Sequence, residues 1–387
     1  MIKQKEEKNL IVGLDIGTSK IVAIVAELQP DGLLNVIGLG QHSSKGLKKG
    51  VVINIDSTME AIQRAIEEAE LMANCKITDV YTGIAGSHIK SINSHGMVKI
   101  KDTEVSQLDV DKVIETACAI TLPNDQQVLH ILTQEYVIDG QEDVRQPLGM
   151  SGMKLEVKVH IVTGAIAAAQ NIVKCIKRCG LEVSELVLQP LASSMAVLTD
   201  DEKELGVCLV DIGGGTTDIA VAFRTPLPSA EEIKIKHGYA ARSLASASEQ
   251  IEIPVVDGKE SKTISTLSLA EVIEARLVEL YELVASELKR SGMEDMIASG
   301  IVITGGSSLM KGMVNLGESV FRMPVRIGTP RNVGGLSEVV DNPRYSTGIG
   351  LLLMGKGQLE KEMMSQIDGN SINQIFMKMK NWFQGNF

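Results

Sequence analysis

Apolar runs and helical stripes alternate along the first part of the chain. The runs Leu10–Asp15 and Ile21–Ala26 predict two buried strands, and Gly17-Thr18-Ser19 between them predicts a turn. A helix is expected to begin at Asp56-Ser57, because apolar residues then recur on one helical face. The other elements expected here are strands at Val51–Ile55, Val80–Ile84 and Glu185–Leu188, and helices at Ala165–Cys179 and Leu191–Leu198.

The pattern then begins again. Gly206–Asp211 predicts a strand, Gly213-Gly214-Gly215 a turn and Ile219–Ala222 a returning strand. The unit Val12–Ala26 thus has a near copy at Leu209–Ala222, which indicates two related lobes. A long helix at Leu267–Lys289, a strand at Gly300–Thr304 and a last helix from Gly348–Leu353 are also expected.

Between these halves, residues 87–162 mix short strands with one expected helix at Asp111–Ala119, and they predict a small insert. After the last helix, residues 357–369 are polar and look like a linker. Strands alternating with helices over 387 residues predict an α/β protein of two lobes or more.

Composition narrows the function. The net charge of −11 argues against a nucleic-acid-binding body. The five cysteines are scattered and form neither a metal-binding spacing nor a disulfide framework, which fits a reducing cytoplasm. The charged N-terminus is not a signal peptide, and no apolar run is long enough to span a bilayer, so any membrane contact is expected at a surface.

Two turns carry the same candidate chemistry. Each places a carboxylate, Asp15 or Asp211, at the end of an apolar strand and follows it with glycine and hydroxyl residues. Glycines let backbone N–H groups approach phosphate oxygens, and two carboxylates suit a Mg²⁺ ion that keeps several waters. The candidate phosphate-binding residues are Asp15, Gly17, Thr18, Ser19 and Lys20 in the first turn and Asp211, Gly213, Gly214, Gly215, Thr216 and Thr217 in the second.

A third glycine turn follows the strand at Ile301-Val302-Ile303-Thr304. Backbone as bare as Gly305, Gly306 and Ser307 can lie flat beside a sugar and a base. Any one of these turns alone is as readily an ordinary tight turn. The three together favour a site for ATP with Mg²⁺.

This trio resembles the phosphate 1, phosphate 2 and adenosine motifs of the actin, Hsp70 and sugar-kinase superfamily. Gln189-Pro190-Leu191-Ala192-Ser193 and Ser346-Thr347-Gly348-Ile349-Gly350 resemble its two connecting-helix motifs. Within the superfamily, the chain is similar from about residue 8 onward to FtsA-like bacterial cell-division proteins. That similarity also rests on Gly46-Leu47-Lys48-Lys49-Gly50, Pro228-Ser229-Ala230-Glu231-Glu232 and the C-terminal segment.

The resemblance implies an actin-like (ribonuclease-H-like) two-lobed α/β fold with an inserted small α+β subdomain. It implies that Glu231 and Lys234 border the purine and that Gln189 positions an attacking water, although Gln189 is also explained as a polar helix-start residue. Activity would be slow ATP hydrolysis at most. The implied division is a first lobe of residues 1–86, 163–195 and 345–360, the insert at 87–162, a second lobe at 196–344, a linker at 361–369 and a terminal helix at 370–387.

One departure from the family pattern follows Phe223. FtsA-like sequences have a hairpin there and then a helix opening with Thr-x-Asp-Ile-Ala, and none of this is expected in the present chain, which continues directly with Arg224-Thr225-Pro226. About two dozen residues are missing by this resemblance. The second sheet is therefore expected to lose return strands and to expose an unpaired edge.

The last eighteen residues form a candidate membrane helix. Its apolar residues fall on one helical face, and the two lysines beside them have no acidic neighbour. Such a face suits a lipid interface, although docking on the protein's own core or on a partner is the alternative. The candidate lipid-facing residues are Ile372, Ile375, Phe376, Met379, Trp382 and Phe383.

The resemblance implies an ATP-binding protein that polymerises and tethers a division ring to the cytoplasmic face of the inner membrane. Implied partners are the C-terminal peptide of FtsZ, other copies of the chain, later division proteins and membrane lipid, and no nucleic acid. Two alternatives stay open: a small-molecule kinase of the same superfamily, and an actin-like pilus-assembly adaptor.

Overall fold

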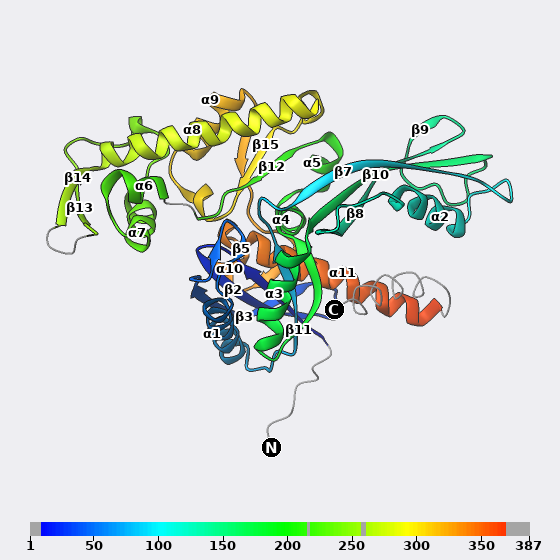
Figure 1. Cartoon of the computed structure of the whole chain (residues 1–387), viewed down its shortest axis with the longest axis horizontal. Coiled ribbons are helices and arrows are strands. Elements are labelled where there is room, and N and C mark those ends of the chain that lie inside the picture. Colours follow the sequence, from blue (N-terminus) through cyan, green and yellow to red (C-terminus); the bar gives the residue numbers. More distant parts are fainter. Residues whose placement is uncertain (1–8, 215–216, 257–260, 369–387) are drawn as a thin grey trace, which may run out of the picture.

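The computed structural model describes residues 9–214, 217–256 and 261–368, apart from the side chains of Thr217, Asp218, Leu227 and residues 362–368. Two lobes lie one above the other in Figure 1, and a third body projects to one side. The first lobe is built on a six-stranded sheet in the order β11-β6-β1-β2-β3-β17. Its strands are β1 (Leu10–Ile16), β2 (Lys20–Leu28), β3 (Leu34–Ser43), β6 (Asp79–Ile84), β11 (Glu182–Leu188) and β17 (Val333–Gly335), with the short pair β4 (Leu47–Lys48) and β5 (Val51–Val52) beside them.

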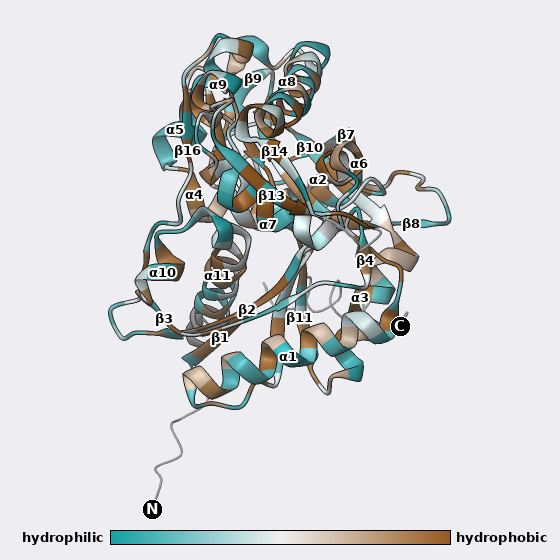
Figure 2. Cartoon of the chain, turned by 90° about the vertical axis from the view of Figure 1, so that its left-hand side faces the viewer, coloured by the Kyte–Doolittle hydropathy of each residue, from teal (hydrophilic) through white to brown (hydrophobic). Residues whose placement is uncertain are grey.

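Helices cover both faces of this sheet. α1 (Ile55–Ala73) and α3 (Ile166–Arg178) pack on one face, and α4 (Gln189–Val197) and α11 (Ser346–Asp368) pack on the other. Figure 2 shows hydrophobic and hydrophilic bands mixed along α1, as expected of a surface helix with one buried stripe. α1 begins one residue earlier than predicted because Asn54 caps it: its Oδ1 accepts from the Ser57 N–H at 2.9 Å. This cap also ends β5 at Val52.

α4 and α11 cross closely under the sheet. A Cβ at Gly350 would lie 1.7 Å from the carbonyl oxygen of Ala192, so only glycine permits this approach. These two helices carry the segments that resemble connecting-helix motifs. The crossing therefore holds both segments against the strand ends of β1 and β12 (Cys208–Asp211).

The insert forms its own sheet. Its four antiparallel strands run in the order β7-β10-β8-β9, and α2 (Gln107–Cys118) packs on one face over a core that includes Val98, Val113 and Leu155. A capping box between Ser106 and Asp109 starts α2 four residues earlier than predicted. The strands are β7 (Lys90–Lys99), β8 (Gln126–Ile138), β9 (Gln141–Val144) and β10 (Lys154–Ala165).

The second lobe has a smaller sheet of three parallel strands in the order β12-β15-β16. α8 (Thr266–Ser291) and α9 (Met313–Phe321) pack over it, and the rings of Tyr281 and Phe321 lie 5.0 Å apart in the core. The remaining elements are α5 (Asp200–Leu205), α6 (Thr217–Phe223), α7 (Leu227–His237), α10 (Ser337–Val340), β13 (Gln250–Pro254), β14 (Ser261–Ser265), β15 (Ile301–Thr304), β16 (Val325–Ile327) and the 3₁₀ turns η2 (Arg242–Leu244), η3 (Glu294–Met296), η4 (Gly306–Leu309) and η5 (Pro343–Tyr345).

The predicted strand Ile219–Ala222 is wrong, because these residues lie in helix α6. The Thr-x-Asp-Ile-Ala pattern that was expected to be missing is present in the sequence as Thr216-Thr217-Asp218-Ile219-Ala220. Helix α6 starts within this pattern. The hairpin alone is absent from the described second lobe, and the helix follows the phosphate-type turn directly. β12 consequently forms one edge of its sheet.

Two further expectations differ from the structure. Residues 357–368 do not form a linker but continue α11 as far as Asp368, because the stretch contains strong helix formers and no proline. β17, from residues assigned to the second lobe, pairs instead with β3 of the first. Gly215, Thr216 and the predicted lipid-facing residues 372–383 lie outside the described residues. None of the described helices combines the length and apolarity needed to cross a bilayer.

Candidate functional site

The two predicted carboxylates stand at the ends of corresponding strands, one in each lobe. Asp15 lies near the end of β1, and Asp211 is the last residue of β12. Helix α4 contacts both groups, Asp15 through Gln189 and Asp211 through Ser193, so the fold brings the two carboxylates to one place. The sequence predicted this pairing across 196 residues from the repeated turn alone.

Hydroxyl and amide side chains from the connecting helices hold both carboxylates. Ser193 Oγ donates to Asp211 Oδ2 at 2.6 Å, and Thr347 Oγ1 donates to the same oxygen at 3.3 Å. Gln189 Nε2 donates to Asp15 Oδ1 at 3.1 Å. The crossing of α4 and α11 thereby fixes both acidic groups. Ser193 and Thr347 were not predicted as site residues, although both lie in segments that the sequence had singled out.

Burial raises the pKa of both carboxylates. It raises the pKa of Asp15 to about 6, and the charge of Lys20 opposes this shift. Asp211 keeps an exposed surface, yet the surrounding protein displaces enough water to raise its pKa, with the Ser193 and Thr347 hydrogen bonds opposing the shift. A bound cation would relieve the repulsion between the two groups.

Lys20 is a buried cation without a hydrogen-bond acceptor among the described residues. Its Nζ is buried and unpaired, and it lies 4.3 Å from the ring centroid of Tyr345. Burial lowers the Lys20 pKa to about 7, with Asp15 opposing this shift and Arg344 adding to it. Two positive groups, Lys20 and Arg344, therefore converge beside the phosphate-type turns. This arrangement suits an anion.

The glycine turns of the two lobes touch. A Cβ at Gly214 would lie 1.8 Å from Ser19 Oγ. Within the first turn, Gly17 N–H donates to the Lys20 carbonyl at 3.0 Å, and Thr18 Oγ1 accepts from Gly50 N–H at 3.3 Å. The two predicted phosphate turns thus face each other across the interface between the lobes.

The third turn and the predicted purine-bordering residues also meet here. Lys234 Nζ lies 2.9 Å from Glu231 Oε2 and 3.3 Å from Ser307 Oγ, and Ser307 Oγ donates to the Gly213 carbonyl at 2.7 Å. Gly305 adopts a positive φ of 85° against Asp211. The fold therefore gathers Glu231, Lys234 and the third glycine turn around the second phosphate-type turn.

Among the described residues, no three His, Cys, Asp or Glu side chains are grouped as metal ligands. Asp15 and Asp211 are two carboxylates. A pair fits Mg²⁺ held mainly by water and phosphate oxygens rather than a closed protein cage. The unpaired Lys20 amine and the bare glycine turns fit the phosphates of such a complex.

Comparison with known proteins decides the family. A family model described as "SHS2 domain inserted in FTSA" matches residues 86–163, and one described as "Cell division protein FtsA" matches residues 216–350. The chain is 52% identical to the cell division protein FtsA of Pseudomonas aeruginosa, covering 98% of each sequence. It is 46% identical to that of Neisseria meningitidis serogroup B, covering 99% of this chain and 100% of the relative. The chain belongs to the FtsA family.

Membership in the FtsA family makes this a cell-division protein of the actin-like fold. The predicted fold class and family are thereby confirmed. A solved structure described as "PilM-PilN type IV pilus biogenesis complex" is similar with a TM-score of 0.63 at 17% identity, covering 89% of this chain and 98% of that one, which supports the fold alone.

The family comparison also bears on the shortened second lobe. The alignment with the P. aeruginosa FtsA spans 409 positions, more than the 387 residues of this chain. That relative therefore has residues that this chain lacks. The unpaired edge of β12 and the direct passage into α6 agree with a loss at the hairpin.

Proposed function

We propose that the chain binds ATP with Mg²⁺ between its lobes and acts as the polymerising membrane tether of a division ring. One observation carries the nucleotide part: two carboxylate-and-glycine turns, one from each lobe, meet face to face at the connecting helices. The unpaired amine of Lys20 and the nearby Arg344 supply positive charge for the phosphates.

Each group has a definite part in this proposal. Asp15 and Asp211 hold the waters of Mg²⁺, and the backbone of the glycine turns receives phosphate oxygens. Lys234 and Glu231 border the base, together with the turn at Gly305. Because Gly214 and Ser19 are in contact, a triphosphate between them requires the two turns to move apart. Nucleotide would in this way set the separation of the lobes.

Hydrolysis is proposed to be slow at most. Gln189 already donates to Asp15, so its amide oxygen is the group left to orient a water near the first turn. The Mg²⁺ ion would withdraw charge from the phosphates. The nucleotide is proposed to serve mainly assembly.

The tether part of the proposal rests on family membership and on the C-terminal sequence. A division protein of this family that ends in an apolar helical face with two lysines fits attachment to the cytoplasmic face of the inner membrane. One tail binds reversibly, whereas several tails on a filament bind far more tightly. We further propose FtsZ, through its C-terminal peptide, and later division proteins as partners, with the insert among the contact surfaces.

Calorimetry with ATP and Mg²⁺ tests the nucleotide site. Wild-type protein should take up about one nucleotide per chain. The double variant Asp15→Ala/Asp211→Ala should lose uptake, and Asp31→Ala in an exposed loop should retain it. Absence of uptake by folded wild-type protein, or equal uptake by the double variant, rejects the site.

Sedimentation with vesicles that contain anionic phospholipid tests the tether. The full chain should pellet with vesicles, and more so with ATP, whereas a chain ending at residue 369 should stay in the supernatant. Equal pelleting of the two chains would contradict a membrane role for the tail.

A further inference from the structure

The outer edge of β7 is an open strand edge. β7 is the first strand in the sheet order β7-β10-β8-β9, and within the described part of the chain it pairs with β10 alone. Ile100 N–H donates to the Met153 carbonyl at 2.9 Å, so Ile100 and Val98 turn their backbone groups toward β10. The intervening residues Met97 and Lys99 then direct theirs outward. No strand among the described residues pairs with this outward side of β7.

Helix α2 runs beside this edge. A Cβ at Gly96 would lie 2.3 Å from the Val113 carbonyl oxygen, and Ser94 Oγ donates to the Ala117 carbonyl at 2.6 Å. The strand edge and the helix together bound an open groove of about 530 Å³. Residues 97–101 line it on the strand side, and Lys112 and Thr116 line it on the helix side.

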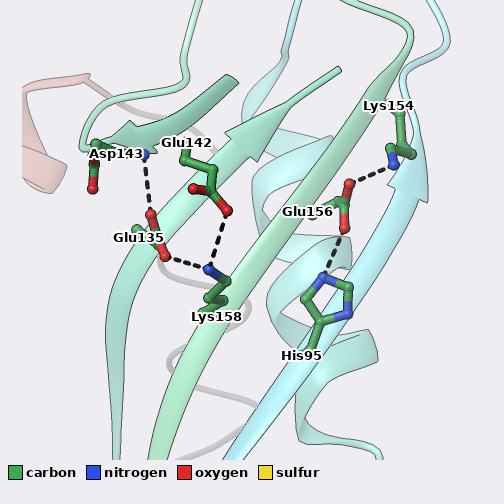
Figure 3. A network of polar contacts seen from close by, with 7 residues as sticks. All are labelled: His95, Glu135, Glu142, Asp143, Lys154, Glu156 and Lys158. Atoms are coloured by element: carbon green, nitrogen blue, oxygen red, sulfur yellow. Dashed lines mark hydrogen bonds and ion pairs between the residues drawn. The ribbon is translucent and has the colours of Figure 1, made fainter. Parts of the chain in front are cut away.

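The groove is basic, whereas the neighbouring charges are neutralised. Figure 3 shows the ion pairs on the sheet face away from α2: Lys158 with Glu135 at 2.6 Å, and Glu156 with both Lys154 and His95. By contrast, Lys99, Lys101 and Lys112 form no ion pair within the described residues, and no acidic residue lines the groove. Three uncompensated cations on a chain of net charge −11 indicate an acidic ligand.

We propose that this groove binds an extended, acidic peptide segment of a partner protein, which adds a fifth strand along β7. The outward N–H and C=O groups of Met97 and Lys99 would pair with the peptide backbone, as in other cases of strand addition. Lys99 lies on one face of the sheet and Lys112 on α2 at the other, so acidic side chains on either face of the peptide meet a lysine.

A peptide fits this groove better than a lipid surface because only a polypeptide can satisfy a row of backbone donors and acceptors. The inference deepens the proposed function, since it rests on the assignment of partner contacts to the insert. It does not depend on nucleotide. The groove lies on the insert, away from Asp15 and Asp211.

Fluorescence anisotropy with a defined probe tests the groove. The probe is a labelled peptide, acetyl-Val-Glu-Val-Glu-Glu-Val-Glu-Val-amide, added to the full chain at low salt. It should bind at least ten-fold more tightly than the peptide with Lys in place of each Glu. It should also bind at least ten-fold more tightly than a version N-methylated at alternate amides. No binding, or equal binding of the N-methylated peptide, overturns the proposal.

Variants locate the binding. Lys99→Glu/Lys112→Glu should weaken the acidic probe at least ten-fold, whereas Lys90→Glu, at the far end of the same strand, should change it less than two-fold. Hydrogen exchange at Met97 and Lys99 should slow when the probe is bound. An unchanged affinity in the double variant, or an effect of Lys90→Glu as large as that of the double variant, overturns the proposal.

Nucleotide uptake measured on the same samples separates the two proposals. Lys99→Glu/Lys112→Glu should bind ATP like wild type, which also shows that it is folded. If wild-type protein takes up nucleotide but does not bind the peptide probe, the proposed groove is wrong and the nucleotide site stands. Probe binding without nucleotide uptake counts against the nucleotide site alone.

Discussion

Gly305 and Gly306 are neighbours in the third glycine turn, but the structure constrains them differently. Gly305 has a φ of 85°, and a Cβ there would lie 2.4 Å from Asp211 Oδ1 and 2.6 Å from the Ile212 carbonyl oxygen. At Gly306 a Cβ would meet only Arg344, at 3.9 Å. The pair therefore offers a test and its control within one turn.

We predict that Gly305→Ala lowers the free energy of unfolding by about 2 kcal/mol or more, because it adds backbone strain and a clash with the carboxylate. Gly306→Ala should change it by less than about 0.5 kcal/mol. Urea denaturation of both variants measures the difference. Equal stability of the two variants would show that the turn can relax around the added methyl group.

The lowered pKa of Lys20 should make the stability of the chain depend on pH. Its pKa is about 7 in the folded chain and 10.5 in the ordinary state, so the unfolded chain binds more protons between these values. Stability from this group therefore rises with pH from about 7 to 10.5. Lys20→Met should abolish that rise and should weaken ATP binding, because it removes both the titrating amine and its positive charge.

Thermal melts at pH 7 and pH 9.5 without nucleotide check the Lys20 prediction. Lys45→Met, in an exposed loop and without an ion pair among the described residues, is the control and should behave as wild type. A wild-type profile that runs parallel to that of Lys20→Met would contradict a buried cation at this position.

The limits of sequence reasoning at the residue scale follow from distance along the chain. Asp15, Asp211 and the glycine turns were predictable because strand, carboxylate and glycine lie within one short segment. The bond from Thr347 to Asp211 joins residues 136 positions apart and depends on how α11 crosses α4. Local pattern contains no information on such a partner, and the position of Lys20 against Tyr345 was missed for the same reason.

At the scale of elements, α6 shows why a short apolar run misleads. Ile219–Ala222 reads equally as a strand or as one helical turn, and the copy of the β1–β2 unit favoured the strand. Contacts of α6 with α7 and α8 place Ile219 in the core of the second lobe and favour the helix. Long periodic elements such as α8 and the buried strand β1 were predicted to within a few residues because their patterns are unambiguous.

The open edge of β12 should be visible in amide exchange. Cys208 donates to Gly300, just before β15, and Ile212 donates to Thr304 of β15, so Val210 between them also faces β15. Leu209 and Asp211 face outward, and no strand among the described residues pairs with that side of β12. We predict that the amides of Leu209 and Asp211 exchange much faster than that of Val210, measured by NMR without nucleotide. Similar slow exchange at all three would show that another segment covers this edge.

At the scale of the whole molecule, hydrogen bonds at the connecting segments fix the lobes to each other. Arg326 of β16 makes two bonds of 2.6 Å to Glu202 of α5, and its Nη2 donates to the Val197 carbonyl at the end of α4. Thr304 Oγ1 lies 2.7 Å from Ser346 Oγ at the start of α11. The repeated turn was enough to predict two lobes from the sequence. The pairing of β17 with β3 could not be predicted, because it joins residues 299 positions apart and no local pattern indicates it.

The contact between Arg326 and Glu202 should contribute to stability in a way that depends on acid pH. Its hydrogen bonds lower the pKa of Glu202 from 4.5 to about 2, so the stabilisation is complete above pH 4.5 and is lost as the pH falls toward 2. Arg326→Met should cost about 2–3 kcal/mol at pH 7, and the cost should shrink in acid. Arg290→Met, which removes an exposed pair with Glu287, should change stability far less than Arg326→Met, because solvent screens an exposed pair.

Urea unfolding of the two arginine variants from pH 7 down to pH 3 measures this contribution. A cost of Arg326→Met that stays constant with pH would assign the effect to lost packing rather than to the charge pair.

Helix α11 is one continuous helix that connects the lobe interface with the C-terminal part of the chain. It starts beside the hydroxyl groups that hold Asp211 and continues unbroken to Asp368, about 32 Å beyond Thr347 at 1.5 Å per residue. A small rotation where the lobes meet is thereby converted into a sideways displacement of several ångströms at the far end. A change in lobe orientation around Asp15 and Asp211 would therefore displace anything bound to the terminal segment. A force on that segment would act in return on the lobe interface.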